Sequence, residues 1–138
     1  MDPASVLSMA GACLTLVTRT VKDVNDIVGK YRKMDQKLAL IVARLNTIRA
    51  TLSQLESWLK TQRDLSNDID TDLQGAIGAC CIVVEEIQLY VTGVRGRGFG
   101  GKIRYLWDEG QFLQFSSALD SQIAALGLFM NVMLLYGP

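Results

Sequence analysis

Apolar residues at alternating spacings of three and four dominate the sequence between residues 38 and 59. Each step returns a leucine or an isoleucine to the same side of an α-helix, because one turn takes 3.6 residues. A strand would instead need apolar residues at every second position. The pattern therefore predicts a long bundle helix over residues 34–64, whose seam is Leu38, Ile41, Leu45, Ile48, Leu52, Leu55 and Leu59.

Three other stretches repeat the helical spacing. Residues 3–28 carry the seam Val6, Met9 or Ala10, Cys13, Val17, Val21, Val24 and Val28. Residues 67–92 follow N-cap candidates at 66–68 and carry the seam Ile69, Leu73, Ile77, Cys80, Val84, Ile87 and Val91. Residues 108–136 carry the seam Phe112, Phe115, Leu119, Ile123, Leu126, Met130 and Met133.

The order of these elements predicts an all-α fold. Residues 93–102, GVRGRGFGGK, are half glycine and are predicted to form a loop, and a short helix over 103–107 follows it. We expect an up-and-down bundle of four long helices in a single domain over residues 1–138. The last helix has no charge after Asp120, so we expect it to be the central and most buried one.

Composition argues against catalysis. The chain has no histidine, which removes the commonest general base and the commonest metal ligand. The aspartates at 68, 70 and 72 are explained by the first turn of a helix, where carboxylates complement the helix dipole. The three cysteines, Cys13, Cys80 and Cys81, form no disulfide or CxxC pattern and are typical of free thiols in a reducing cytosol. We expect no enzyme activity, cofactor or metal.

Residues 3–18, PASVLSMAGACLTLVT, contain no charge. As a helix they span about 24 Å, shorter than the ~30 Å hydrocarbon core of a bilayer but unusually apolar for a surface helix. A secretory signal peptide is not favoured, because Asp2 is the only charge ahead of the run. The segment is predicted to be either a buried bundle helix or a membrane-entering one, with the inserting residues Val6, Leu7, Met9, Gly11, Leu14, Leu16 and Val17.

Basic residues gather in two places, which are Lys30, Arg32, Lys33 and Lys37 after the first helix, and Arg95, Arg97, Lys102 and Arg104 around the glycine-rich loop. Solvated loops explain both clusters, and anionic lipid head groups are the alternative. The loop also contains G-x-G-x-x-G, but a dinucleotide site needs a preceding strand. The loop's resemblance to an RGG segment is weak in a chain with fourteen basic and fourteen acidic residues. We expect anionic lipid, and no nucleic acid, as a partner.

The N-terminal Met-Asp-Pro, the uncharged helix that follows it and the segment VKDVNDIV at 21–28 resemble the start of fungal HeLo-like domains. The segments TLSQL at 51–55 and IRYLW at 103–107 are similar to that family too. HeLo-like domains are the N-terminal domains of many fungal NOD-like (STAND) receptors and related cell-death proteins. Their architecture is related to the N-terminal bundle of the mixed-lineage kinase-like pseudokinase.

The resemblance implies a cell-death domain that oligomerises and permeabilises membranes through its N-terminal helix. It further implies cytoplasmic residence at rest, movement to the plasma membrane on activation, and control by a regulatory domain or receptor in cis or in trans. No such domain follows Pro138, and we expect a longer natural protein. Two alternatives stay open, which are a non-lytic oligomerisation or adaptor domain and a bundle that contacts RNA through the glycine-arginine loop.

Overall fold

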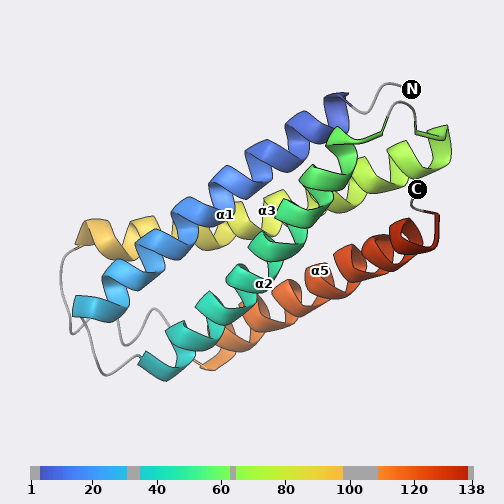
Figure 1. Ribbon diagram of the computed structural model, residues 1–138. Helices are drawn as coiled ribbons and strands as arrows, with labels where there is room; N and C mark the ends of the chain where they lie inside the picture. Colours follow the sequence, from blue (N-terminus) through green and yellow to red (C-terminus); the bar gives the residue numbers. More distant parts are fainter. Residues whose placement is uncertain (1–3, 31–34, 63–64, 98–108, 137–138) are drawn as a thin grey trace.

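The computed structural model describes residues 4–30, 35–62, 65–97 and 109–136. These ranges hold four long helices, α1 (Ala4–Lys30), α2 (Asp35–Lys60), α3 (Asn67–Arg97) and α5 (Glu109–Tyr136). Successive helices run in opposite directions, so α1 is parallel to α3 and α2 is parallel to α5 (Figure 1). The all-α, up-and-down bundle of four long helices is therefore confirmed.

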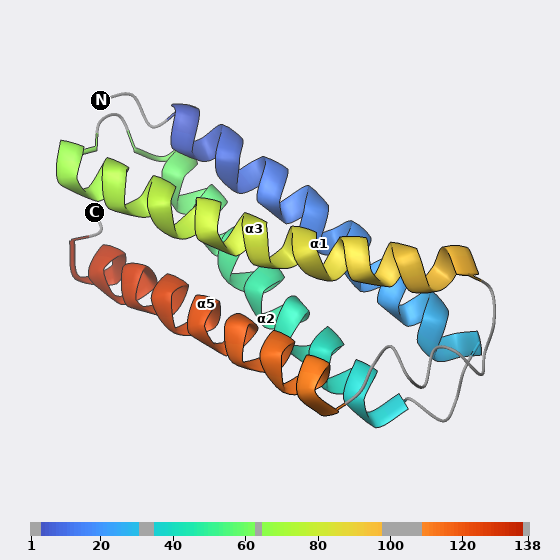
Figure 2. The same cartoon turned by 180° about the vertical axis from the view of Figure 1, so that it is seen from behind.

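Each helix packs against two neighbours. Helix α1 lies against α2 and α3, and α5 lies against the same two helices on the other side of the bundle. Seen from behind, α3 lies between α1 and α5 (Figure 2). The order around the bundle is therefore α1, α2, α5, α3, with α1 and α5 at opposite corners.

The predicted seams form the core. All seven seam residues of α2 are buried, and on α3 all are buried except the half-buried Ile69. On α1 the buried set comprises Val6, Ala10, Cys13, Val17, Val21 and Val24. The spacing of apolar residues thus identified the inward faces of these three helices, because burial on one side of a helix requires that spacing.

The connection between α2 and α3 is set by local hydrogen bonds. Helix α2 ends at Lys60, four residues before the predicted boundary, where the backbone N–H groups of Thr61 and Gln62 donate to carbonyls three residues back. Such tighter bonds are typical of a final helical turn. Ser66 then caps α3, because its Oγ accepts the backbone N–H of Ile69 at 3.3 Å. The predicted cap is confirmed.

The prediction that residues 93–102 form a loop is wrong for its first half. Helix α3 continues to Arg97 and includes Gly93 and Gly96. Glycine costs a helix about 1 kcal/mol per residue relative to alanine, but an existing helix gains one hydrogen bond with each added residue. Residues 98–102, and the short helix predicted at 103–107, lie outside the described residues.

The expectation that the last helix is the most buried is also wrong. Helix α5 buries Phe115, Leu119, Leu126 and Met133, fewer apolar side chains than the seven of α2. The exposed fractions of Leu113, Leu128 and Leu135 are 55%, 65% and 82%. A lack of charge permits burial, but only neighbouring helices produce it, and α5 packs less closely against α2 and α3 than α2 packs against α1 and α5.

Candidate membrane-active helix

Helix α1 divides the residues predicted to insert into a membrane between two environments. Val6 and Val17 are fully buried in the core. The others are half-buried, and the apolar ones pack against the edge of the core; this second group comprises Leu7, Met9, Gly11, Leu14 and Leu16. All seven residues lie on α1, which is one continuous helix packed within the bundle.

The threonines of α1 satisfy their hydroxyl groups inside the helix. Thr15 donates to the carbonyl of Gly11 at 3.0 Å, and Thr18 donates to that of Leu14 at 2.8 Å. A hydroxyl without a partner is costly in an apolar environment, whereas one bonded to its own backbone needs no water. These bonds make the side chains of Thr15 and Thr18 compatible with a protein interior or with lipid.

A polar cluster joins the second half of α1 to α3; it consists of Thr20, Asp23 and Gln88 and is called here the α1–α3 clasp. The Gln88 Nε2 donates to Asp23 Oδ2 at 2.7 Å. The Thr20 hydroxyl, fully buried, lies 2.7 Å from Gln88 Oε1 and 2.8 Å from the Leu16 carbonyl, so its single proton is shared between two acceptors. Sequence reasoning missed the clasp, and the only signal was a threonine within the buried face of α1.

The three cysteines also join these helices. Cys13 of α1 and Cys80 of α3 are buried and Cys81 is half-buried, and all three are free thiols. A hydrogen bond with Cys80, together with burial, raises the pKa of the Cys13 thiol far above its ordinary value. Burial is the main cause that raises the pKa of Cys81. The reactive species is the thiolate, so the raised pKa values make Cys13 and Cys81 less reactive than ordinary thiols while α1 is packed.

The eight cations predicted to meet anionic lipid are described only in part. Lys37 is half-buried, with its Nζ 6.0 Å from the centroid of the Phe112 ring. For three others the structure gives only backbone positions in α1 or α3, namely Lys30, Arg95 and Arg97. The remaining four lie outside the described residues: Arg32, Lys33, Lys102 and Arg104. The ends of α1 and α3 and the start of α2 share one end of the bundle (Figure 1).

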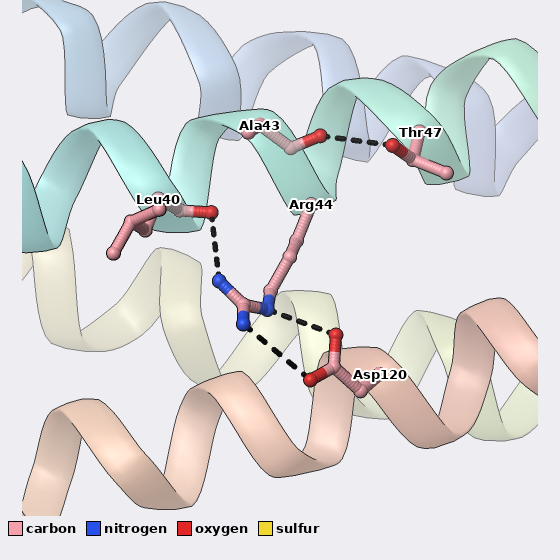
Figure 3. A network of polar contacts seen from close by, with 5 residues as sticks. All are labelled: Leu40, Ala43, Arg44, Thr47 and Asp120. Atoms are coloured by element: carbon pink, nitrogen blue, oxygen red, sulfur yellow. Dashed lines mark hydrogen bonds and ion pairs between the residues drawn. The ribbon is translucent and has the colours of Figure 1, made fainter.

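The single charged side chain that the structure describes in α5, Asp120, has a partner on α2. Asp120 accepts from Arg44 Nε at 2.9 Å and from Arg44 Nη2 at 3.5 Å, and Arg44 Nη1 also donates to the Leu40 carbonyl (Figure 3). Both side chains are partly solvated, with exposed fractions of 27% and 58%. The pair links α5 to α2 but contributes little to stability, since solvated ion pairs add little free energy. An isolated Asp in an uncharged helix was the signal for it.

Among the described residues, no three His, Cys, Asp or Glu side chains gather in a way that would hold a metal ion. Comparison of the chain with protein-family models, with curated proteins and with solved structures finds no match. The class that the fold defines is therefore a four-helix, all-α bundle.

Proposed function

We propose that this chain is a HeLo-like cell-death execution domain that oligomerises and permeabilises membranes through α1. The observation that carries the proposal is the dual character of this helix. Its stretch Ala4–Asp26 is long and apolar enough to cross a membrane, and about a third of that stretch is buried in the bundle. The stretch Asp68–Thr92 of α3 meets the same criterion, and core helices of soluble bundles also do. The proposal therefore rests on α1 being stable in two environments, the bundle and the membrane.

The apolar side chains of α1 favour burial both in the bundle and in lipid. Burying a valine, leucine or methionine side chain stabilises either state by roughly 1.5–3 kcal/mol. The inward residues gain this in the bundle, and the half-buried ones, such as Leu7 and Leu14, would gain more in lipid. Since the two states draw on the same apolar surface, a modest change in local concentration or contacts is enough to shift the population.

The basic residues near one end of the bundle support an orientation in which this end faces the membrane. The basic clusters at 30–37 and 95–104 begin on helix ends that share this end of the bundle (Figure 1). Each cation near an anionic bilayer contributes about 1 kcal/mol of attraction. In the proposed mechanism a receptor or regulatory domain raises the local concentration, this end approaches the plasma membrane, and α1 leaves the bundle. This sequence of events fits a role in fungal innate immunity, in which a NOD-like receptor triggers programmed cell death.

The test is dye leakage from liposomes that contain anionic lipid. The intact chain is compared with a chain that lacks residues 2–18 and with Leu14→Glu, which places a charge on a half-buried position of α1. The matched control is Leu40→Glu, the same change at a 49% exposed leucine of α2. We expect leakage from the intact chain and the control only. A folded, oligomerising chain that releases no dye, or equal leakage by Leu14→Glu, would refute the mechanism.

A non-lytic adaptor is the second candidate, and the outer face of α5 favours it. Leu113, Leu128 and Leu135 are exposed on a helix whose described side chains include one charge. Exposed apolar faces of this kind are typical of protein interaction surfaces. Under this hypothesis Leu128→Glu abolishes self-association measured by light scattering, and neither the intact chain nor the variant releases dye.

A further inference from the structure

A groove runs along the contact between α1 and α2 on the outside of the bundle. One hollow of about 370 Å³ is bordered by Leu14 and Thr18 of α1 and by Asn46, Arg49 and Ser53 of α2. A second hollow of about 510 Å³ shares the first two residues and extends along the outer side of α1. The two hollows together are called here the α1–α2 groove.

The charged side chains that line the groove are all basic. Arg19 and Lys22 line it from α1, and Arg49 lines it from α2. None of the three takes part in a hydrogen bond or an ion pair with any part of the chain that the structure describes. Arg44 and Lys60 differ, because they pair with carboxylates. Arg49 lines the hollow between the two helices, and Arg19 and Lys22 line the adjoining hollow on α1, so the groove as a whole carries a positive potential that concentrates anions.

The neutral groups of the groove add suitable chemistry. The Oδ1 atom of Asn46 is buried and has no hydrogen-bond partner, and a half-turn of this amide brings its Nδ2 donor into the same place. Ser53 offers a hydroxyl whose proton no described group accepts. The hydroxyls of Thr15 and Thr18 are used within α1. The groove therefore presents donors from α2 and charge from both helices.

We propose that the α1–α2 groove binds a phosphate group carried by an anionic ligand. A phosphate accepts hydrogen bonds through several oxygens, and a guanidinium matches two of them at once. Arg49 is the guanidinium in the hollow that both helices border, which assigns the anchor role to it. Lys22 and Arg19 supply further positive charge from α1. Leu14 and Ala50 provide an apolar border that suits the organic part of a phosphate ester. The ligand is either the head group of a lipid or a small soluble phosphate.

Because the site is built from two helices, a bound phosphate stabilises their contact. A ligand that binds only the packed bundle raises its stability by mass action. Binding therefore opposes the departure of α1 from α2. The binding itself is independent of the proposed function, whereas this effect on the release of α1 rests on it.

The test measures two probes on the intact chain. Isothermal titration calorimetry follows pyrophosphate, and co-sedimentation follows phosphatidylcholine vesicles with and without phosphatidic acid. The variants are Arg49→Gln, Lys22→Gln and, as the matched control on α2, Lys60→Gln, whose side chain is 62% exposed and lies outside the groove. Circular dichroism establishes that each variant is folded.

We expect each groove variant to weaken binding about fivefold and the control to leave it nearly unchanged, since one cation contributes ~1 kcal/mol near an anionic surface. The affinity of Arg49→Lys should lie between those of the intact chain and Arg49→Gln, because lysine keeps the positive charge but lacks the two parallel N–H donors of the guanidinium. Binding of pyrophosphate with this pattern assigns a soluble ligand, and binding of phosphatidic acid vesicles alone assigns a lipid head group.

Absence of saturable binding of both probes would overturn the proposal. An equal effect of Lys60→Gln and Arg49→Gln would do so as well, because it would indicate a diffuse charge effect. The dye-leakage assay is separate from these measurements. Groove-dependent binding without leakage would support the phosphate site and refute the lytic function. Leakage without groove-dependent binding would support the lytic function and refute the phosphate site.

Discussion

Replacement of Gln88 by alanine tests the release of α1 without altering α1 itself. The change removes both α1–α3 contacts of the clasp, namely the bond to the Asp23 carboxylate at 2.7 Å and the contact with the Thr20 hydroxyl at 2.7 Å. Thr20 keeps its bond to the Leu16 carbonyl at 2.8 Å, so no hydroxyl proton is left without an acceptor. The inserted form of α1 is the same in both proteins.

The magnitude follows from these two bonds, because the third bond of Gln88, from its Nε2 to Thr92 Oγ1 at 3.1 Å, is solvent-exposed and is replaced by water. A neutral hydrogen bond contributes about 0.5–1.5 kcal/mol and one to a charged group about 1.5–3 kcal/mol. Gln88 is half-buried, so water replaces part of what is lost and about 2 kcal/mol is a reasonable net value. If departure of α1 limits membrane permeabilisation, that value accelerates dye leakage about thirtyfold, since ~1.4 kcal/mol corresponds to a factor of ten in rate.

The assay is the initial rate of dye release from anionic liposomes at equal protein concentration. Gln74→Ala is the matched control, because the hydrogen bond of Gln74, from its Nε2 to the buried Asp70 carboxylate at 2.9 Å, lies within α3 and does not join α3 to α1. We expect similar losses in the free energy of unfolding from both variants but faster leakage only from Gln88→Ala. Equal acceleration by the two variants would show that general destabilisation, and not the clasp, controls permeabilisation.

Three further predictions concern the bundle itself. Leu45→Ala should lower the free energy of unfolding by about 2–5 kcal/mol, because Leu45 is fully buried. Leu40→Ala, on the half-exposed side of α2, should change it by less than ~0.5 kcal/mol. Similar values for the two variants in urea denaturation would contradict the packing of α2. Gly75→Ala should raise the free energy of unfolding by up to about 1 kcal/mol, because the added methyl group meets nothing within 4 Å, and a lower melting temperature would refute this. The raised pKa of Cys13 keeps its thiol protonated in the folded state, while the unfolded thiol ionises near its ordinary value of 9.0. Stability from this residue is therefore complete below pH 9 and decreases above it, by at most about 1.4 kcal/mol per pH unit, and Cys13→Ala should show a shallower decline in alkaline urea titrations.

The candidate site was only partly predictable. The sequence identified α1 as an unusually apolar helix, because the absence of charge over residues 3–18 needs no structure to be seen. It did not identify Gln88, since a glutamine between exposed and buried positions of α3 gives no sign of which helix it faces. The clasp and the α1–α2 groove each combine residues that are more than twenty positions apart. Only the packing of helices brings them together.

The sequence by itself determined the four helices and the inward face of three of them, because helical periodicity is a local property that apolar spacing reveals. It also placed the N-cap of α3 within residues 66–68, because a cap acts within one turn, and the structure assigns it to Ser66. Tertiary structure decided the remaining features. Helix α5 is apolar yet exposes Leu128 and Leu135, because burial depends on the extent of packing and α5 packs less extensively against its two neighbours than the other helices do. Helix α3 continues through Gly93 because propagation outweighs the weak propensity of glycine.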